Sequence, residues 1–154
     1  MKKCCGLIAA CCLLMGFSPV ANAKGQCGAK EKTLFYCATK NKKEILLCDA
    51  GKTINYSFGK INARPELSVK VPRDKVTAIP WNGVGRYMSD SIEVPNGNAV
   101  YSVFFSMDRM TDEHKIDAGV SVLVNDKPAA TVSCIEKTIV NNLGDAELKR
   151  ADQD

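Results

Sequence analysis

The stretch RYMSDSIEVPNGNAVYSVFFSM, residues 86–107, decides the fold. Pro95-Asn96-Gly97 lies near its centre, and Asn-Gly is the preferred pair for the tight two-residue turn of a β-hairpin. Residues 98–107 after this turn are rich in β-branched and aromatic side chains, which favour strands. Residues 86–94 before it supply the partner strand. The sequence therefore predicts an antiparallel hairpin here.

The same short-period pattern continues on both sides of the hairpin. Residues 53–58 place Ile54, Tyr56 and Phe58 on one face and polar side chains on the other, which indicates a half-buried strand. Alternation bounded by turn residues predicts further strands at 33–37, 44–48, 67–71, 120–124 and 129–135.

These short strands at hairpin spacing, with no convincing helix between them, predict an all-β fold. We expect a single antiparallel β-barrel or sandwich of about eight strands. A parallel sheet is disfavoured because it needs helical crossovers. Residues 141–154 are polar and acidic, and we expect a short helix or a disordered tail there.

The first residues predict export. Lys2 and Lys3 precede an apolar stretch at 4–17, and Ala21-Asn22-Ala23 follows, which is the layout of a secretory signal peptide (1–23) cut after Ala23. A lipoprotein attached at Cys11 is a less favoured alternative, because that cut would leave a very short apolar core. No second apolar run reaches the ~20 residues of a membrane helix. We therefore expect a periplasmic or secreted β domain at 24–140.

Four cysteines remain after such a cut: Cys27, Cys37, Cys48 and Cys134. Outside the cytoplasm they are expected to pair as disulfides, and three pairings are possible. We expect Cys27–Cys37 and Cys48–Cys134, the second of which would tie an early strand to the last. The spacing contains no Cys-x-x-Cys pair, so neither structural zinc nor a redox-active pair is indicated.

No catalytic or metal-binding set is indicated, and we predict no cofactor. The sole histidine, His114, lies in a charged loop, and no Gly-x-Ser-x-Gly segment accompanies it. Asp112, Glu113 and Asp117 lack the ligand spacing and the bend glycine of a calcium loop. The sequence therefore favours a protein that is not an enzyme.

A glycine-rich stretch, Asn82-Gly83-Val84-Gly85, supplies the candidate binding site. It lacks the Gly-Lys-Ser/Thr ending of a phosphate loop. It is flanked by Trp81, Arg86 and Tyr87, which are the residue types that dominate binding hot spots. These three residues are therefore predicted to contact a protein partner.

Charge is unevenly distributed along the chain. Residues 24–75 contain 12 basic and 5 acidic side chains, whereas residues 76–154 contain 7 basic and 12 acidic ones. One end of the molecule could therefore attract an acidic partner or a second copy of the chain, the alternative being ordinary solvated surface. No aromatic residues interleave with a dense Lys/Arg run, so nucleic-acid binding is not indicated.

Two segments resemble the bacterial periplasmic inhibitors of lysozyme. Gly83-Val84-Gly85-Arg86-Tyr87 is similar to their first motif, and residues 101–105 followed by Ser106 are similar to their aromatic strand. The chain differs from the family at two places. The family has serine where this chain has Gly83, and the family has lysine where this chain has Met107-Asp108. The resemblance implies a disulfide-bonded β domain that binds a cell-wall-degrading enzyme.

We therefore expect a non-enzymatic, periplasmic protein-binding domain, an inhibitor of or immunity factor against such an enzyme. Two alternatives stay open. One is a small-ligand carrier or an enzyme that uses a pocket at a barrel mouth. The other is an envelope structural protein with no soluble ligand.

Overall fold

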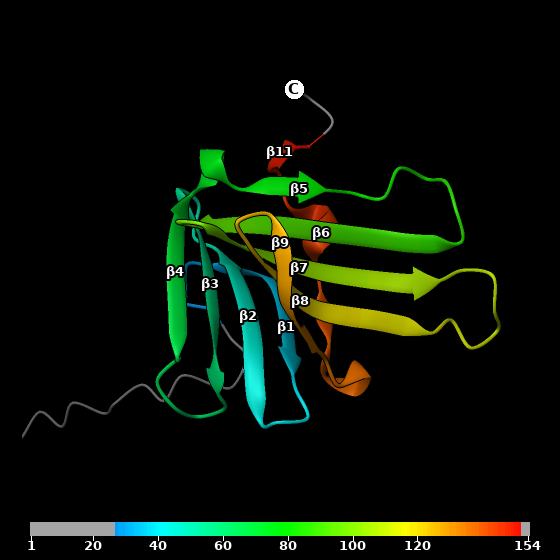
Figure 1. The fold of residues 1–154 in the computed structure, drawn as a ribbon, viewed down its shortest axis with the longest axis horizontal. Coiled ribbons are helices and arrows are strands. Elements are labelled where there is room, and N and C mark those ends of the chain that lie inside the picture. Colours follow the sequence, from blue (N-terminus) through cyan, green and yellow to red (C-terminus); the bar gives the residue numbers. More distant parts are fainter. Residues whose placement is uncertain (1–26, 152–154) are drawn as a thin grey trace, which may run out of the picture.

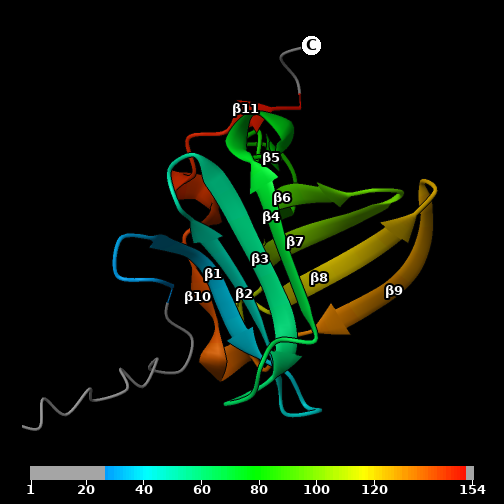
Figure 2. The same cartoon turned by 90° about the vertical axis from the view of Figure 1, so that its left-hand side faces the viewer.

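A computed structural model describes residues 27–151. Within this range the chain forms two β-sheets, three single 3-10 turns and no α-helix. The two sheets pack face to face as a sandwich (Figures 1 and 2). The predicted signal peptide, the alternative attachment site Cys11 and residues 152–154 lie outside the described residues.

The first sheet has five antiparallel strands in the order β10-β1-β2-β3-β4: β1 (Lys32–Ala38), β2 (Lys43–Asp49), β3 (Thr53–Lys60), β4 (Leu67–Pro72) and β10 (Val140–Asn141). The second sheet has the order β11-β5-β6-β7-β8-β9: β5 (Thr77–Ile79), β6 (Tyr87–Asn96), β7 (Ala99–Asp108), β8 (Ile116–Val124), β9 (Lys127–Ser133) and β11 (Lys149–Arg150). The β11–β5 pair is parallel. The 3-10 turns are η1 (Arg73–Lys75), η2 (Glu136–Thr138) and η3 (Leu143–Asp145).

The core lies between the sheets and is built from apolar rows that cross the strands. One row in the first sheet is formed by Phe35, Leu47, Tyr56 and Val69, which are in register on β1 to β4 and are all buried. A facing row in the second sheet is formed by Ala78, Ile92, Val103 and Val120 on β5 to β8. The Tyr56 ring stacks on the Tyr101 ring at 5.0 Å between centroids, and so joins the two layers. Burial raises the pKa of Tyr56 above its usual range, so its hydroxyl stays protonated.

The all-β prediction is confirmed in its sandwich form, and the barrel form is not. The predicted hairpin is present, but its turn lies one residue later than expected: Asn96 pairs with Ala99, so the two turn residues are Gly97, at φ 61°, and Asn98. The strand count is higher than expected because β5, β10 and β11 have two or three residues each. Segments this short carry no periodic pattern. Strand β8 also begins at Ile116, earlier than predicted.

The four cysteines form two disulfides, but the expected pairing is wrong. The bonds are Cys27–Cys48 and Cys37–Cys134. Cys37 is fully buried between the sheets, and it meets Cys134 just after β9. Cys48 is in register with Asn55, and both side chains lie on the face of the first sheet that is opposite to the face of Cys37. Side chains on opposite faces of a sheet reach different partners, so Cys48 bonds to the segment that precedes β1.

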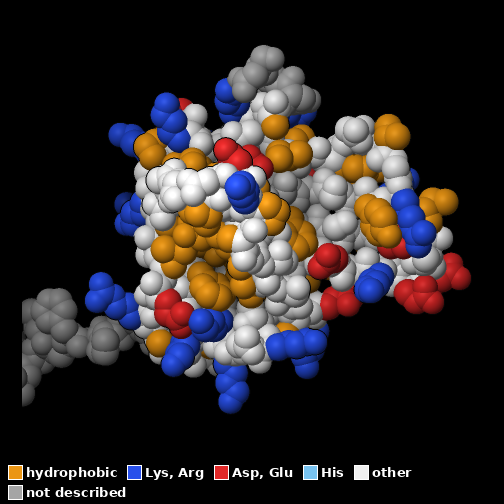
Figure 3. Space-filling view, viewed as in Figure 1, with side chains coloured by type: hydrophobic (Ala, Val, Ile, Leu, Met, Phe, Trp, Pro, Cys, Tyr) orange, Lys and Arg blue, Asp and Glu red, His pale blue; other side chains and the backbone are white. Residues whose placement is uncertain are grey.

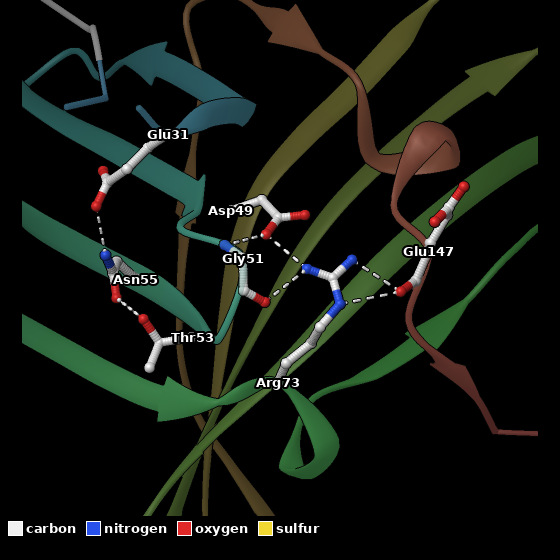
Figure 4. Close-up of polar contacts among 7 residues, drawn as sticks. All are labelled: Glu31, Asp49, Gly51, Thr53, Asn55, Arg73 and Glu147. Carbon is white, nitrogen blue, oxygen red and sulfur yellow. Dashed lines mark hydrogen bonds and ion pairs between the residues drawn. The ribbon is translucent and has the colours of Figure 1, made fainter. Parts of the chain in front are cut away.

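The C-terminal segment is joined to both sheets. Leu143 is buried, and Asn142 Nδ2 donates to Thr33 O at 2.9 Å. The guanidinium of Arg73 donates to Asp49 Oδ1 and, through Nε and Nη2, to Glu147 O at 3.2 and 2.8 Å (Figure 4). The helix or disorder expected at 141–154 is therefore replaced, as far as residue 151, by one 3-10 turn and two short strands.

Candidate functional site

Two loops lie side by side at one end of the second sheet. The loop at 80–86 leads into β6, and the loop at 109–115 joins β7 to β8. Tyr87, the first residue of β6, is in register with Asp108, the last residue of β7, so the loops leave the sheet together. This end of β6, β7 and β8 extends beyond the first sheet (Figure 1). The first sheet therefore leaves both loops uncovered.

An ion pair holds the base of the two loops. Arg86 Nε donates to Asp108 Oδ1 and Oδ2 at 3.1 and 2.9 Å, and Arg86 Nη2 donates to Oδ2 at 2.6 Å. The carboxylate also accepts the backbone N–H of Met110 at 2.9 Å. The Arg86 hydrogen bonds and this N–H hold the pKa of Asp108 below its usual value, so the pair stays charged at neutral pH. Asp108 itself is only 5% exposed.

The first loop is ordered around Trp81. Its indole Nε1 donates to Val84 O at 2.9 Å, and its backbone N–H donates to the Asp90 carboxylate at 3.1 Å. Gly83 and Gly85 have φ of 85° and 100°. This left-handed region of backbone conformation suits glycine, so the two glycines allow the turn that brings Val84 O to the indole N–H of Trp81.

Arg109 joins the second loop to the first. Its backbone N–H donates to Arg86 O at 2.9 Å, and its Nη1 donates to Gly85 O at 3.2 Å. The guanidinium carbon lies 4.6 Å from the centre of the Trp81 ring, within cation–π distance. The two loops therefore form one connected unit.

We use the name loop surface for six residues of these two loops and of the adjoining start of β6, namely Trp81, Val84, Arg86, Tyr87, Arg109 and Met110. Val84, Met110 and Tyr87 are 75%, 74% and 55% exposed, the three highest values among the large hydrophobic residues described. In Figure 3 the projecting end shows hydrophobic surface next to Lys/Arg surface. Exposed apolar side chains on an ordered backbone are typical of interaction sites.

A cavity opens beside the loop surface. Its volume is about 350 Å³, and it is lined by Tyr87, Ser106, Asp108, Lys115 and Asp117. The lining groups include two carboxylates, one ammonium group and two hydroxyls. Such a cavity could take a small polar group.

Of the other polar candidates, Asp117 lines this cavity, whereas His114, Asp112 and Glu113 do not. His114 is exposed at φ 46°, and its Nδ1 lies 3.1 Å from Asp108 O. Asp112, Glu113 and Asp117 are not gathered into a cluster of possible metal ligands. Among the described residues such a cluster is found at Cys27, Glu31 and Cys48, but both sulfurs there are held in the disulfide.

The structure thus brings together Trp81, Arg86 and Tyr87, the three residues predicted to contact a partner. Sequence analysis did not include Asp108, Arg109 and Met110 in the binding site, and the available signal was their position directly after the strand predicted at 98–107. Of the aromatic strand on which the resemblance rests, Val103 and Phe105 are buried and Tyr101 stacks on Tyr56, so this strand mainly builds the core.

Comparisons with protein-family models, with curated proteins and with solved structures found no match. No helix in residues 27–151 has the length and apolarity needed to cross a membrane.

Proposed function

We propose that this protein is an exported, non-enzymatic domain that binds a protein partner through the loop surface. The observation that carries the proposal is the combination of Trp81, Tyr87 and two arginines with exposed Val84 and Met110 on hydrogen-bonded loops. Trp, Tyr and Arg are enriched in hot spots. An ordered loop loses little conformational freedom on binding, which favours affinity.

Export is supported by the two disulfides together with the signal-like first residues. Disulfides persist in oxidising compartments outside the cytoplasm. The resemblance to lysozyme inhibitors suggests a cell-wall-degrading enzyme as the partner. The loop surface includes Arg86 and Tyr87 from the segment that carries this resemblance.

The test compares two double variants of the oxidised protein. Tyr87→Ser/Met110→Ser removes two exposed apolar side chains from the loop surface and leaves the Arg86–Asp108 pair in place. The matched control, Ile79→Ser/Val140→Ser, removes two that are 41% and 44% exposed elsewhere. Binding and inhibition are measured against a panel of lysozymes and other cell-wall hydrolases.

We expect the loop variant to weaken binding roughly 30- to 700-fold, since two hot-spot losses of about 1–2 kcal/mol each add to about 2–4 kcal/mol. The control should bind like the wild type. Equal binding by all three proteins, or no binding and no inhibition at micromolar concentration, would contradict the proposal.

The 350 Å³ cavity favours a second candidate, a carrier of a small polar ligand. Ser106→Leu would place a larger apolar side chain in this cavity and leave all six residues of the loop surface unsubstituted, although Tyr87 belongs to both. If a small polar ligand raises the melting temperature of the wild type but not of this variant, and hydrolase binding is the same for both proteins, the carrier is favoured.

A further inference from the structure

A second surface lies away from the loop surface, at the end of the first sheet where two turns meet. The β1–β2 turn and the β3–β4 turn both lie at the lower end of the sheet in Figures 1 and 2, together with η2. We call this surface the basic end, and it consists of Lys40, Lys42, Lys43, Lys60, Arg64 and Lys137. In Figure 3 Lys/Arg surface runs along the same lower rim.

The backbone fixes these residues as neighbours. The N–H of Ile61 donates to Lys42 O at 3.1 Å, which joins the two turns directly. Lys43 and Lys60 are opposite each other in the β2–β3 pairing. The hydroxyl of Thr138, next to Lys137, accepts the N–H of Ala38 at 3.0 Å, which holds η2 against the end of β1.

Most of this positive charge has no acidic partner among the residues that the structure describes. Lys43 Nζ pairs with Glu66 at 2.7 Å and lies 5.1 Å from the Phe58 ring. No ion pair within residues 27–151 involves any of the other five members of the basic end. Glu44 and Glu136 are the remaining acidic residues in these segments, and Glu136 is exposed.

This arrangement costs stability. Like charges on neighbouring strands and turns repel, and only the charge of Lys43, opposite Lys60, is offset by an ion pair among the described residues. All five unpaired cations are exposed on turns, at a strand end or on η2. Exposed cations on neighbouring turns can contact a charged surface together, and no described pocket is lined by them.

We propose that the basic end binds the phosphate headgroups of an anionic lipid bilayer. Exposed Ala63 and Pro65 flank Arg64 on the β3–β4 turn and would add small apolar contacts at the headgroup level. The loop surface projects from a different side of the molecule, so a protein held at a membrane by its basic end would keep the loop surface accessible (Figure 1). This inference does not depend on the identity of the protein partner.

The test is co-sedimentation of the oxidised protein with vesicles of phosphatidylcholine containing 30% phosphatidylglycerol, and with pure phosphatidylcholine vesicles. Each basic residue near an anionic surface strengthens binding roughly fivefold. The quadruple variant with glutamine at Lys40, Lys42, Lys60 and Arg64 should therefore bind several hundredfold more weakly. Binding of the wild type should fall steeply between about 0.05 and 0.5 M salt, because the Debye length shortens.

The matched control places glutamine at Lys30, Lys52, Lys70 and Lys127, four exposed lysines elsewhere with the same total charge change. It should retain binding within about tenfold of the wild type. Equal losses in both quadruple variants would overturn the proposal, since binding would then follow net charge alone. Equal sedimentation with both vesicle types, or complete competition by soluble polyphosphate at matched phosphate concentration, would also overturn it. Thermal unfolding checks that both variants fold.

Discussion

Removing the Cys37–Cys134 bond should destabilise the protein more than removing the Cys27–Cys48 bond. The two bonds close loops with sequence separations of 97 and 21 residues. In the chain-entropy model these loops correspond to about 4.7 and about 3.3 kcal/mol of unfolding free energy. The difference of about 1.4 kcal/mol is a factor of ten in the unfolding equilibrium constant.

The two bonds also differ in burial, which should increase the difference in destabilisation between the two variants. Cys37 is fully buried among the core side chains, whereas Cys27 is half-buried on the outer face of the first sheet. Replacing Cys37 by alanine therefore also removes packing contacts between the sheets. The double variants Cys37→Ala/Cys134→Ala and Cys27→Ala/Cys48→Ala isolate each bond without leaving a free thiol from the broken pair.

Urea unfolding of the oxidised proteins provides the measurement. With a slope of about 1.5–2 kcal/mol per M, loss of the longer loop should lower the midpoint by roughly 2 to 3 M. Non-reducing digestion and mass mapping of the wild type should show the same two bonds. Equal midpoints for the two variants, or a lower midpoint for the Cys27→Ala/Cys48→Ala protein, would refute the reasoning.

Three further variants test individual contacts. Gly119→Ala would place a Cβ 2.0 Å from the Val132 carbonyl oxygen, so we expect a loss of about 1–3 kcal/mol in urea unfolding, and an unchanged midpoint would contradict the close approach of β8 and β9. Arg73→Ala should expose the C-terminal segment to trypsin at Arg150 in the folded state, and resistance equal to that of the wild type would show that the guanidinium is not needed to hold it. Folding lowers the pKa of Asp108, so the ionised carboxylate stabilises the folded state. This contribution to the free energy of unfolding is complete above about pH 4, the pKa in the unfolded chain, and is lost as the pH falls through the lower pKa of the folded state. Asp108→Asn should therefore flatten the fall in melting temperature between pH 4 and 2, and an unaltered profile would exclude this carboxylate as a cause.

Most of the strands could be predicted because the signal for them is local. Ile54, Tyr56 and Phe58 point inward, and the alternation that predicts this is carried by adjacent residues. The turn at Gly97-Asn98 is equally local, since its backbone needs a residue that tolerates positive φ, which Gly97 provides. The binding candidates Trp81, Arg86 and Tyr87 were predicted by the same means, from residue types that flank a glycine-rich stretch, and they stay a prediction.

The choice of sandwich rather than barrel could not be made from those patterns. Both folds bury one face of each strand, and the difference lies in which edges pair. The partners of Arg86 and Trp81, which are Asp108 and Arg109, also could not be predicted from the sequence. They come to lie beside the loop at 80–86 only after β6 and β7 have paired.

The sequence alone determined that this chain is built from short strands, where its turns lie and which four cysteines are joined. Tertiary structure decided which cysteines pair, how the C-terminal segment is held and which loops share one surface. The physical reason is that strand and turn preferences act between neighbouring residues. The faces of Cys37 and Cys48, and the approach of Arg73 to Glu147, depend on the register and packing of segments distant in the chain.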